Sequence, residues 1–296
     1  MNHRLLCPLC NSRQNKTLEI VYPTNKNFYD SVNNNYGLGK FLIKNNYYYE
    51  LNLCKCCGTR YQTVFLNEME SSKLYSENIQ AKKSFIKQVV NYKRNLNIRL
   101  KTGKIIERFL KSSHKNSYNV LEVGAGWGFF AYVNSQPNLK FTTLEIGEDR
   151  KILHKLLDLK RIESLEEALD LGLKFDAIYS NQVIEHLPNL SKFVKTCDKL
   201  LEKGGFFIAE YPSYNNFIHY LFQKKTYYGD MRTKALEHLQ LISDKGAKEL
   251  FKNIDSLEYI KFFPIRKLGD RLRYIIQLLT SSKSKGSGFI VAKKIK

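Results

Sequence analysis

Long apolar runs are missing from this chain of 296 residues. No stretch of about 18 apolar residues occurs, which excludes a conventional membrane-spanning helix. The first ten residues, MNHRLLCPLC, contain no apolar core of a secretory signal. We therefore expect a cytoplasmic protein that is long enough to bury a sizeable core.

Acidic residues are scarce, with 28 Asp and Glu against 48 Lys and Arg, for a net charge of +20. The excess is uneven, because residues 71–118 carry +10 and residues 259–296 carry +9, whereas residues 119–258 carry −2. We interpret the excess positive charge as basic residues on solvent-exposed faces. The alternative interpretation is a binding site for a polyanion in the two basic segments. A nucleic-acid partner is therefore not favoured, while a phosphate-bearing ligand remains compatible with the charge.

Cysteines are few, and in a cytoplasmic chain six of them indicate thiols or a metal site rather than disulfides. Four form two Cys-x2-Cys turns, Cys7 with Cys10 and Cys54 with Cys57. Two such turns can complete a tetrahedral zinc site, and four thiolates leave no open position, so the zinc would be structural. Cys56 offers another register, but Cys54 preserves the two-residue spacer. Four unrelated free cysteines are the alternative.

The flanks of the second turn fit a zinc ribbon. Residues 47–54 and 59–66 are predicted to form two strands of a hairpin, and Gly58 suits the tight turn between them. We therefore predict a small zinc-binding module over residues 1–70. Residues 71–118 have apolar positions near helical spacing and are predicted to be a helical connector, broken or bent at Gly103.

Strands and helices alternate from residue 119, which predicts an α/β domain over residues 119–296 with a parallel, doubly wound sheet. One helix is expected to end at Gly204, and Ser243 is the predicted N-cap of a later helix. The predicted strands cover residues 118–124, 140–147, 175–181, 204–212, 257–265 and 288–295.

The segment VLEVGAGWGFF, residues 120–130, places three glycines after a buried strand. Missing Cβ atoms let the backbone turn tightly and approach a ligand at the carboxyl end of the strand. Glu145 ends the next strand, where a carboxylate can accept both hydroxyls of a ribose. These features predict a nucleotide-type site.

The spacing is Glu-x-Gly-x-Gly-x-Gly, which resembles motif I of class I S-adenosylmethionine-dependent methyltransferases and differs from the dinucleotide pattern. FDAIYSNQVIEHLPN (175–189), LLEKGGFFIAEYP (200–212) and EHLQLISDKGAKELFKNI (237–254) resemble later motifs of that family. The resemblance covers residues 119–296. It implies a Rossmann-like, seven-stranded sheet, mostly parallel with the last strand antiparallel, and S-adenosylmethionine as cofactor.

The resemblance also implies residue roles. Glu122 is expected near the methionine end of the cofactor, Glu145 at the ribose and Ile146 against the adenine. Asn181 is expected to face the methionine part or to cap its strand. The implied cofactor-binding residues are Glu122, Gly124, Ala125, Gly126, Gly128, Glu145, Ile146, Asn181 and Gln182.

Methyl transfer to a hydroxyl requires alignment of the acceptor and removal of its proton. His186 follows the fourth strand of the motif and is either that general base or a histidine that shapes the pocket. His238 is the second catalytic candidate. Tyr211 and Tyr214 could line the same mouth.

The combination of cysteine turns and a methyltransferase motif resembles bacterial sugar methyltransferases of surface-polysaccharide or secondary-metabolite pathways. It implies a small-molecule acceptor, a saccharide or a nucleotide- or phosphate-linked sugar, and O-methylation, because the chain lacks the additional C-terminal domain of the sugar C-methyltransferases. One alternative is an RNA or protein methyltransferase that docks through the zinc module. Another is a non-catalytic binding protein with the same fold.

Overall fold

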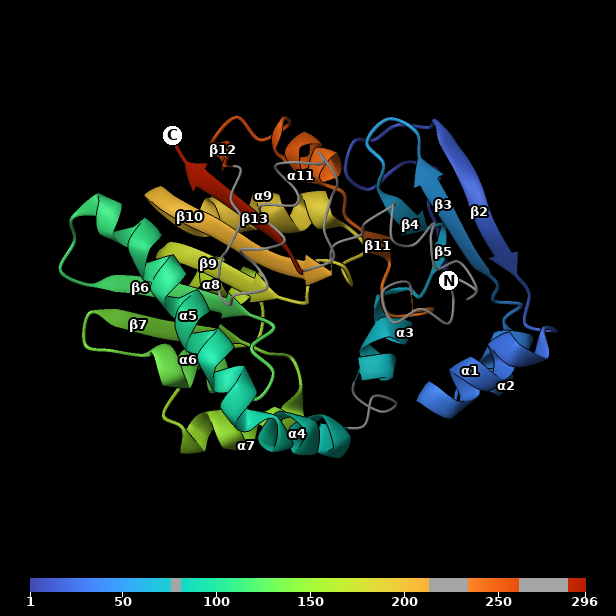
Figure 1. Ribbon diagram of the computed structural model, residues 1–296, viewed down its shortest axis with the longest axis horizontal. Coiled ribbons are helices and arrows are strands. Elements are labelled where there is room, and N and C mark those ends of the chain that lie inside the picture. Colours follow the sequence, from blue (N-terminus) through green and yellow to red (C-terminus); the bar gives the residue numbers. More distant parts are fainter. Residues whose placement is uncertain (76–80, 213–233, 261–286) are drawn as a thin grey trace. The chain divides into compact units, whose positions relative to one another are not determined.

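The computed structural model describes residues 1–75, 81–212, 234–260 and 287–296 (Figure 1). These residues form two compact units that interleave along the chain. The N-terminal unit contains residues 1–80, 185–191 and 212–250, and the α/β unit contains residues 81–184, 192–211 and 251–296. None of the helices in the described part combines the length and apolar character that crossing a membrane requires.

The two units are not consecutive in sequence, whereas the predicted boundaries at residues 70 and 118 divide the chain into consecutive segments. The later segments join the N-terminal unit through backbone hydrogen bonds. Leu239 donates its N–H to the carbonyl of Glu185, and Gln62 donates its N–H to the carbonyl of Leu239. Sequence patterns of charge and cysteine do not reveal such pairings between distant segments.

The α/β unit is built on one seven-stranded sheet with the order β12-β13-β10-β9-β6-β7-β8. The strands from β10 to β8 pair in parallel, whereas β12 and β13 pair antiparallel. This is the predicted doubly wound fold, with an antiparallel pair at one edge. The strands are β6 (Tyr118–Val123), β7 (Leu139–Leu144), β8 (Lys160–Ile162), β9 (Phe175–Asn181), β10 (Leu201–Pro212), β12 (Leu257–Ile260) and β13 (Ser287–Lys294).

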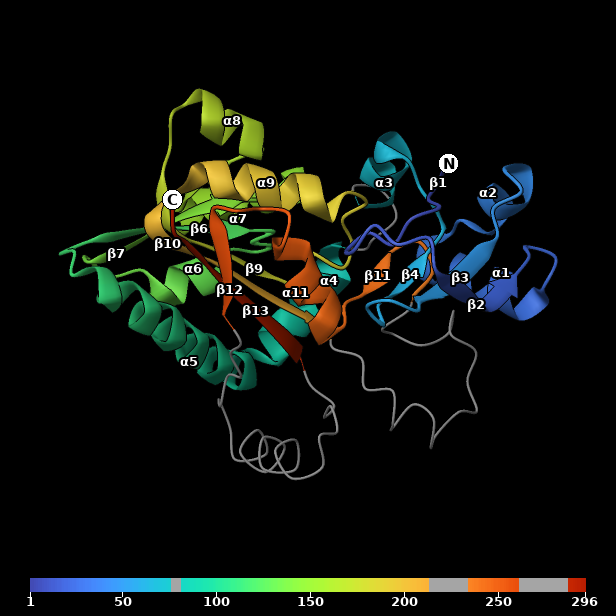
Figure 2. The same cartoon turned by 90° about the horizontal axis from the view of Figure 1, so that it is seen from above.

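Helices cover both faces of this sheet, with α5 and α6 on one side and α8 and α9 on the other (Figure 2). The two central strands, β6 and β9, are buried almost throughout, as expected for strands covered on both faces. The helices of this unit are α4 (Ala81–Val90), α5 (Tyr92–Leu110), the 3₁₀ turn η2 (Lys111–Ser113), α6 (Phe129–Asn134), α7 (Glu148–Leu156), α8 (Leu165–Asp170) and α9 (Leu190–Leu200).

Two glycines behave differently from the sequence prediction. Gly103 does not break a helix, because α5 runs through it without interruption. A Cβ there would lie 1.9 Å from Oδ1 of Asn134 on α6, so glycine lets the two helices approach closely. The helix before β10 ends at Leu200 rather than at Gly204, which lies within β10 beside a register shift and has a φ of 82°.

The N-terminal unit contains a four-stranded sheet, β11-β4-β3-β2, and a two-stranded sheet, β1-β5. The predicted hairpin is confirmed, since β3 and β4 pair antiparallel with Leu53 opposite Arg60. Fully buried aromatic residues such as Tyr47 and Tyr49 fill the core of the unit. Its elements are β1 (Asn2–His3), β2 (Asn15–Val21), α1 (Lys26–Tyr36), α2 (Gly39–Lys44), β3 (Tyr49–Cys54), β4 (Arg60–Gln62), β5 (Val64–Phe65), α3 (Glu68–Lys73) and β11 (Gln240–Leu241).

Helix α11 (Asp244–Phe251) follows β11, and its start confirms the predicted N-cap. The Ser243 hydroxyl accepts the N–H of Gly246 at 2.9 Å and donates to the carbonyl of Cys57. A capping side chain therefore also ties this helix start to the second cysteine turn. Of the two predicted closing strands, residues 261–265 lie outside the described part, and Tyr214 also lies outside it.

Candidate functional site

The glycine turn joins β6 to α6 and has backbone angles that favour glycine. Gly124, Gly126 and Gly128 have φ values of 67°, 57° and 75°. A Cβ on Gly124 would meet Val183 at 2.4 Å, and one on Gly128 would meet Leu159 at 2.6 Å. These two glycines make room for side chains of the protein itself.

Gly126 differs from its two neighbours in the turn. A Cβ at this position would have no other atom within 4 Å, so the protein leaves open space beside this backbone. The Gly126 carbonyl accepts a hydrogen bond from Nε2 of buried His154 at 2.8 Å. Its N–H donates to Glu145 at 2.8 Å. These two hydrogen bonds therefore fix the turn, while the space beside Gly126 remains open to a ligand.

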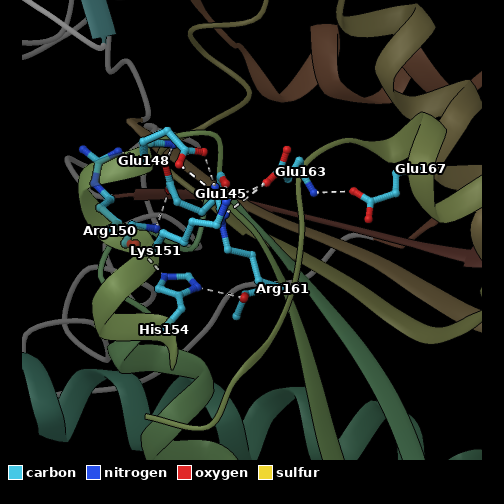
Figure 3. A network of polar contacts seen from close by, with 11 residues as sticks. Glu145, Glu148, Arg150, Lys151, His154, Arg161, Glu163 and Glu167 are labelled. Atoms are coloured by element: carbon cyan, nitrogen blue, oxygen red, sulfur yellow. Dashed lines mark hydrogen bonds and ion pairs between the residues drawn. The ribbon is translucent and has the colours of Figure 1, made fainter. Parts of the chain in front are cut away.

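Glu145 lies directly after β7 at the centre of a polar network (Figure 3). One carboxylate oxygen accepts the N–H of Gly126, and the other accepts the N–H of Gly147 and a bond from Arg150, each at 2.8 Å. Arg161 donates to the Glu145 carbonyl at 2.9 Å. Because the side chain is buried and oriented by three donors, it holds a negative charge in a defined position.

Glu122 on β6 is buried in the same unit. Its carboxylate accepts the N–H of Ala131 on α6 at 3.0 Å. Burial raises the pKa of Glu122 to about 8, against the opposing effects of the Ala131 hydrogen bond and of the nearby Arg99 charge. The carboxyl group is therefore largely protonated at neutral pH and can donate as well as accept a hydrogen bond.

A cavity of about 480 Å³ opens beside the glycine turn, a volume suited to a small molecule or cofactor. It lies at the carboxyl ends of the neighbouring strands β6 and β9, where the order of the strands in the sheet reverses direction along the chain. Its lining includes six of the nine predicted cofactor residues. The predicted residues that line it are Glu122, Gly124, Ala125, Gly126, Asn181 and Gln182.

The other three predicted residues lie outside that lining. Gly128 begins α6, and Glu145 reaches the turn through Gly126. Ile146 follows Glu145 and leaves 61% of its surface exposed, which is unusual for a large apolar side chain at the end of a strand.

Gln182, which lines the cavity, has a φ of 57° and donates its N–H to the carbonyl of Glu210. The backbone after β9 is therefore held in a rare conformation at the cavity.

Several residues of the cavity were not predicted from the sequence. Arg99 and Thr102 come from α5, and Glu210 comes from β10. Glu210 accepts hydrogen bonds from Tyr179 at 3.0 Å and from Thr102 at 3.4 Å. Arg99 is the one cation among the described residues that line this cavity. No local sequence signal marks these residues, because they belong to ordinary helix and strand patterns.

The two cysteine turns meet in the N-terminal unit and form what we call the four-cysteine cluster, Cys7, Cys10, Cys54 and Cys57. All four sulfur atoms lie within 4.8 Å of one another. The Cys7–Cys57 and Cys10–Cys54 sulfur pairs are 3.6 and 3.5 Å apart. Four sulfurs bound tetrahedrally at about 2.3 Å to one zinc ion lie about 3.8 Å apart, so the cluster fits that ion.

Local geometry in the second turn is also that of a zinc knuckle. The N–H of Cys57 points to the sulfur of Cys54, and Gly58 has a φ of 76°. Cys56 lies outside the cluster, where its sulfur contacts the hydroxyl of Ser12 at 3.1 Å. Cys197 is fully buried on α9. All six cysteines are thiols rather than disulfides.

The N-terminal unit also brings together the two predicted catalytic histidines and Glu185. The rings of His186 and His238 are 4.7 Å apart in an edge-to-face arrangement. Nε2 of His186 lies 3.8 Å from a carboxylate oxygen of Glu185. Potential metal-ligand atoms of the three residues lie within 4.8 Å of one another, so the set has both proton-transfer and cation-binding chemistry.

Hydrogen bonds define the tautomer of His186. Nδ1 lies 2.9 Å from the carbonyl of Glu237 and 3.0 Å from the hydroxyl of Tyr75. A carbonyl can only accept, so Nδ1 carries the proton and Nε2 keeps its lone pair. Burial, together with a smaller effect of the nearby His238, lowers the pKa of His186 to about 4. His186 is therefore neutral at neutral pH, with Nε2 able to accept a proton.

Glu185 is fully buried, and neither of its carboxylate oxygens has a hydrogen-bond partner in the described part of the chain. Burial raises its pKa to about 8, so the carboxyl group is mostly protonated at neutral pH. Tyr211 is one of the two tyrosines that were predicted to line the opening of the acceptor site. It is buried in the α/β unit and lies against Gly288. It is thus part of the packing of that unit.

Comparison with known proteins places these features in a family. The sequence profile of a family described as a methyltransferase domain matches residues 92–255, more than half of the chain. The mouse mitochondrial ubiquinone biosynthesis O-methyltransferase is 32% identical over 100 residues, which cover 29% of this chain and 26% of that protein. The Pseudomonas paraeruginosa ubiquinone biosynthesis O-methyltransferase is 27% identical over 94 residues, covering 29% of this chain and 40% of the relative. The matches thus span less than half of these relatives.

Solved structures share the fold at low sequence identity. The plantazolicin methyltransferase BpumL, in complex with a monoazolic desmethylPZN analog and SAH, superposes with a TM-score of 0.53 at 11% identity, covering 76% of this chain and 94% of that one. The plantazolicin methyltransferase BamL gives 0.53 at 14% identity, with the same coverage. With the profile match over more than half of its length, the chain belongs to the methyltransferase-domain family, the enzyme class predicted from its sequence.

Proposed function

We propose that this methyltransferase transfers the methyl group of S-adenosylmethionine to a hydroxyl oxygen of a small-molecule acceptor. The observation that carries the proposal is the cavity at the carboxyl ends of β6 and β9, where Gly126 faces open space beside the oriented carboxylate of Glu145. A nucleoside-bearing cofactor needs both a close backbone and a fixed hydrogen-bond acceptor for its ribose. The relatives named as O-methyltransferases agree with transfer to an oxygen, and the structures named as complexes with SAH agree with this cofactor.

The α/β unit supplies a partner for each part of the cofactor. Glu145 accepts the two ribose hydroxyls, and the exposed Ile146 covers the adenine. Arg99 binds the carboxylate of the methionine moiety, because it is the one cation among the described lining residues. Glu122, largely protonated, donates a hydrogen bond to a polar atom at the methionine end.

The sulfonium already activates the methyl group, so the protein has to align the acceptor and remove its proton. Asn181 and Gln182, at the end of β9, orient the methionine part. His186 follows Asn181 by five positions in the chain and has an unprotonated Nε2. From this position in the sequence we propose His186 as the general base, with His238 as its edge-to-face neighbour; it lines neither of the two described cavities of the α/β unit.

The four-cysteine cluster holds a structural zinc ion in this proposal. The sulfur spacing fits one tetrahedral ion, and four thiolates leave no position for a substrate. The ion would tie the first cysteine turn to the hairpin of β3 and β4, and through Ser243 to the start of α11. Zinc binding thus stabilises the N-terminal unit rather than taking part in the chemistry.

The test is calorimetric titration of the full chain with S-adenosylmethionine. Glu145→Gln keeps the shape of the side chain but removes its charge, and we expect affinity to fall about thirtyfold, or about 2 kcal/mol. Glu148→Gln is the control, since Glu148 lies three positions on, with a largely exposed side chain. Equal losses in both variants, or none in Glu145→Gln, would contradict the ribose assignment. No binding by the unaltered protein would refute the proposed cofactor.

A further inference from the structure

A second cavity of about 590 Å³ adjoins the proposed cofactor cavity within the α/β unit. The two cavities share four lining residues, so they adjoin one another there. The shared residues are Gln88, Ile98, Arg99 and Asn181. Asn181 ends β9, the strand end at which the proposed cofactor presents its methionine part. This position makes the second cavity the natural place for the methyl acceptor.

One continuous stripe of α4 and α5 forms most of the wall. The lining positions recur at intervals of three or four residues across the junction of the two helices, so they share one face. Thr102, the next position in this series, lines the cofactor cavity. The stripe consists of Ser84, Lys87, Gln88, Asn91, Arg94, Asn95, Ile98 and Arg99.

The chemistry of this stripe is unusual for a helix face that borders a cavity. Ile98 is its one apolar member, and the others are amides, cations and a hydroxyl. No carboxylate lines the cavity among the described residues, and residues 81–106 contain eight Lys and Arg but no Asp or Glu. The one acidic residue of these two helices, Glu107 near the end of α5, pairs with Lys111, so it does not neutralise the cations of the stripe.

Individual contacts support a preference for an anion. Lys87 and Arg94 have no ion-pair partner in the part of the chain that the structure describes. Arg99 donates to the side-chain oxygen of Gln88 at 2.7 Å, which joins α4 to α5 and orients the guanidinium between the two cavities. A phosphate or carboxylate can accept two hydrogen bonds from a guanidinium and one from a nearby ammonium.

We propose that this second cavity is the acceptor site and that the acceptor is a polar, hydroxyl-bearing small molecule with an anionic group, a phosphate or a carboxylate. The anion is held by Lys87 and Arg94, and the hydroxyls are held by the amides of Gln88, Asn91 and Asn95. The inference rests on the proposed function, because it takes the adjoining cavity as the cofactor site. It separates this enzyme from one that methylates a quinone with an apolar tail, since such a molecule would leave these cations and amides desolvated and unpaired.

The experiment is calorimetric titration of the full chain, saturated with S-adenosylhomocysteine, with four probes: glucose, glucose 1-phosphate, glucuronate and inorganic phosphate. We expect the two anionic sugars to bind at least tenfold more tightly than glucose, and the stronger of the two identifies the anion. In the Lys87→Gln/Arg94→Gln variant that preference should fall at least tenfold. The Lys82→Gln/Lys83→Gln variant, with exposed lysines on α4 outside the lining, should keep it within twofold.

The outcomes separate this inference from the proposed function. If S-adenosylhomocysteine binds all three proteins equally but the anionic sugars bind no better than glucose, the acceptor assignment is wrong and the cofactor site stands. An equal loss of anion binding in both double variants would show a diffuse charge effect and would also overturn the assignment. If S-adenosylhomocysteine does not bind the unaltered chain, the proposed function itself fails.

Discussion

Gly126 allows a test that separates backbone strain from ligand binding. Its φ of 57° is in the left-handed region, and an added Cβ would have no atom of the protein within 4 Å. Gly126→Ala should therefore destabilise the fold only through the left-handed conformation, by about 1–2 kcal/mol. The new methyl group would nevertheless occupy the open space that the cofactor needs beside the turn.

Gly172 is a matched control. Its φ is 63°, an added Cβ would also have no neighbour within 4 Å, and it does not line the described cavities. Gly172→Ala should thus cost the same 1–2 kcal/mol or so in unfolding free energy. The two variants differ in whether the added methyl group meets the proposed cofactor.

The assay combines chemical denaturation with titration of S-adenosylmethionine. We expect similar losses of unfolding free energy in the two variants, but a loss of affinity of at least about tenfold, or about 1.4 kcal/mol, in Gly126→Ala alone. Equal affinity in Gly126→Ala and the unaltered protein would refute the close approach of the cofactor to this turn. A comparable loss in Gly172→Ala would show that general destabilisation, not contact, explains the effect.

Four further predictions concern other parts of the chain. Metal analysis of protein purified without chelator should find about one zinc ion per chain, and its removal should unfold the N-terminal unit; a folded unit with less than a tenth of that zinc would contradict the site. His186→Asn should lower turnover by about 10²–10⁴ while leaving S-adenosylmethionine affinity unchanged, and a variant that keeps a third of the turnover would exclude a general base. Because burial lowers the pKa of His186 to about 4, the imidazole stays neutral well below pH 6.5, and turnover should not fall through protonation of the base until the pH approaches 4. In the unfolded state His186 takes up its proton at a higher pH, so the free energy of unfolding should decrease as the pH falls from about 6.5 towards 4. A fall in turnover at pH 6–7 would contradict the assignment of His186 as the general base. Gly103→Ala should cost about 1–3 kcal/mol in thermal unfolding despite the better helix propensity of alanine, and adding Asn134→Ala should relieve the overlap, so that the double variant is less destabilised than the sum of the single changes.

The site was only partly readable from local patterns. The glycine turn, Glu122 and the carboxylate of Glu145 stand next to buried strands, and a strand followed by a glycine turn identifies itself over a short window. Arg99 and Glu210 have no such signal, because their relevance depends on which helix face and strand end meet at one cavity. Gly103 was misread for the same reason: glycine in a helix can mark a bend or a close contact, and only the position of Asn134 on α6 distinguishes them.

The sequence by itself determined the local elements: the alternation of strands and helices, the glycine turn, the N-cap at Ser243 and the two cysteine turns with their hairpin. Each of these depends on neighbours within a few residues along the chain, through side-chain periodicity, φ preference or ligand spacing. Only the tertiary structure decided which distant segments meet. It brought the two cysteine turns to sulfur distances of 3.5 and 3.6 Å, placed the rings of His186 and His238 side by side in the N-terminal unit, and aligned one polar face of α4 and α5 along two adjoining cavities. Such meetings depend on the packing of the whole chain, in which many residues far apart in sequence must bury their apolar surface together.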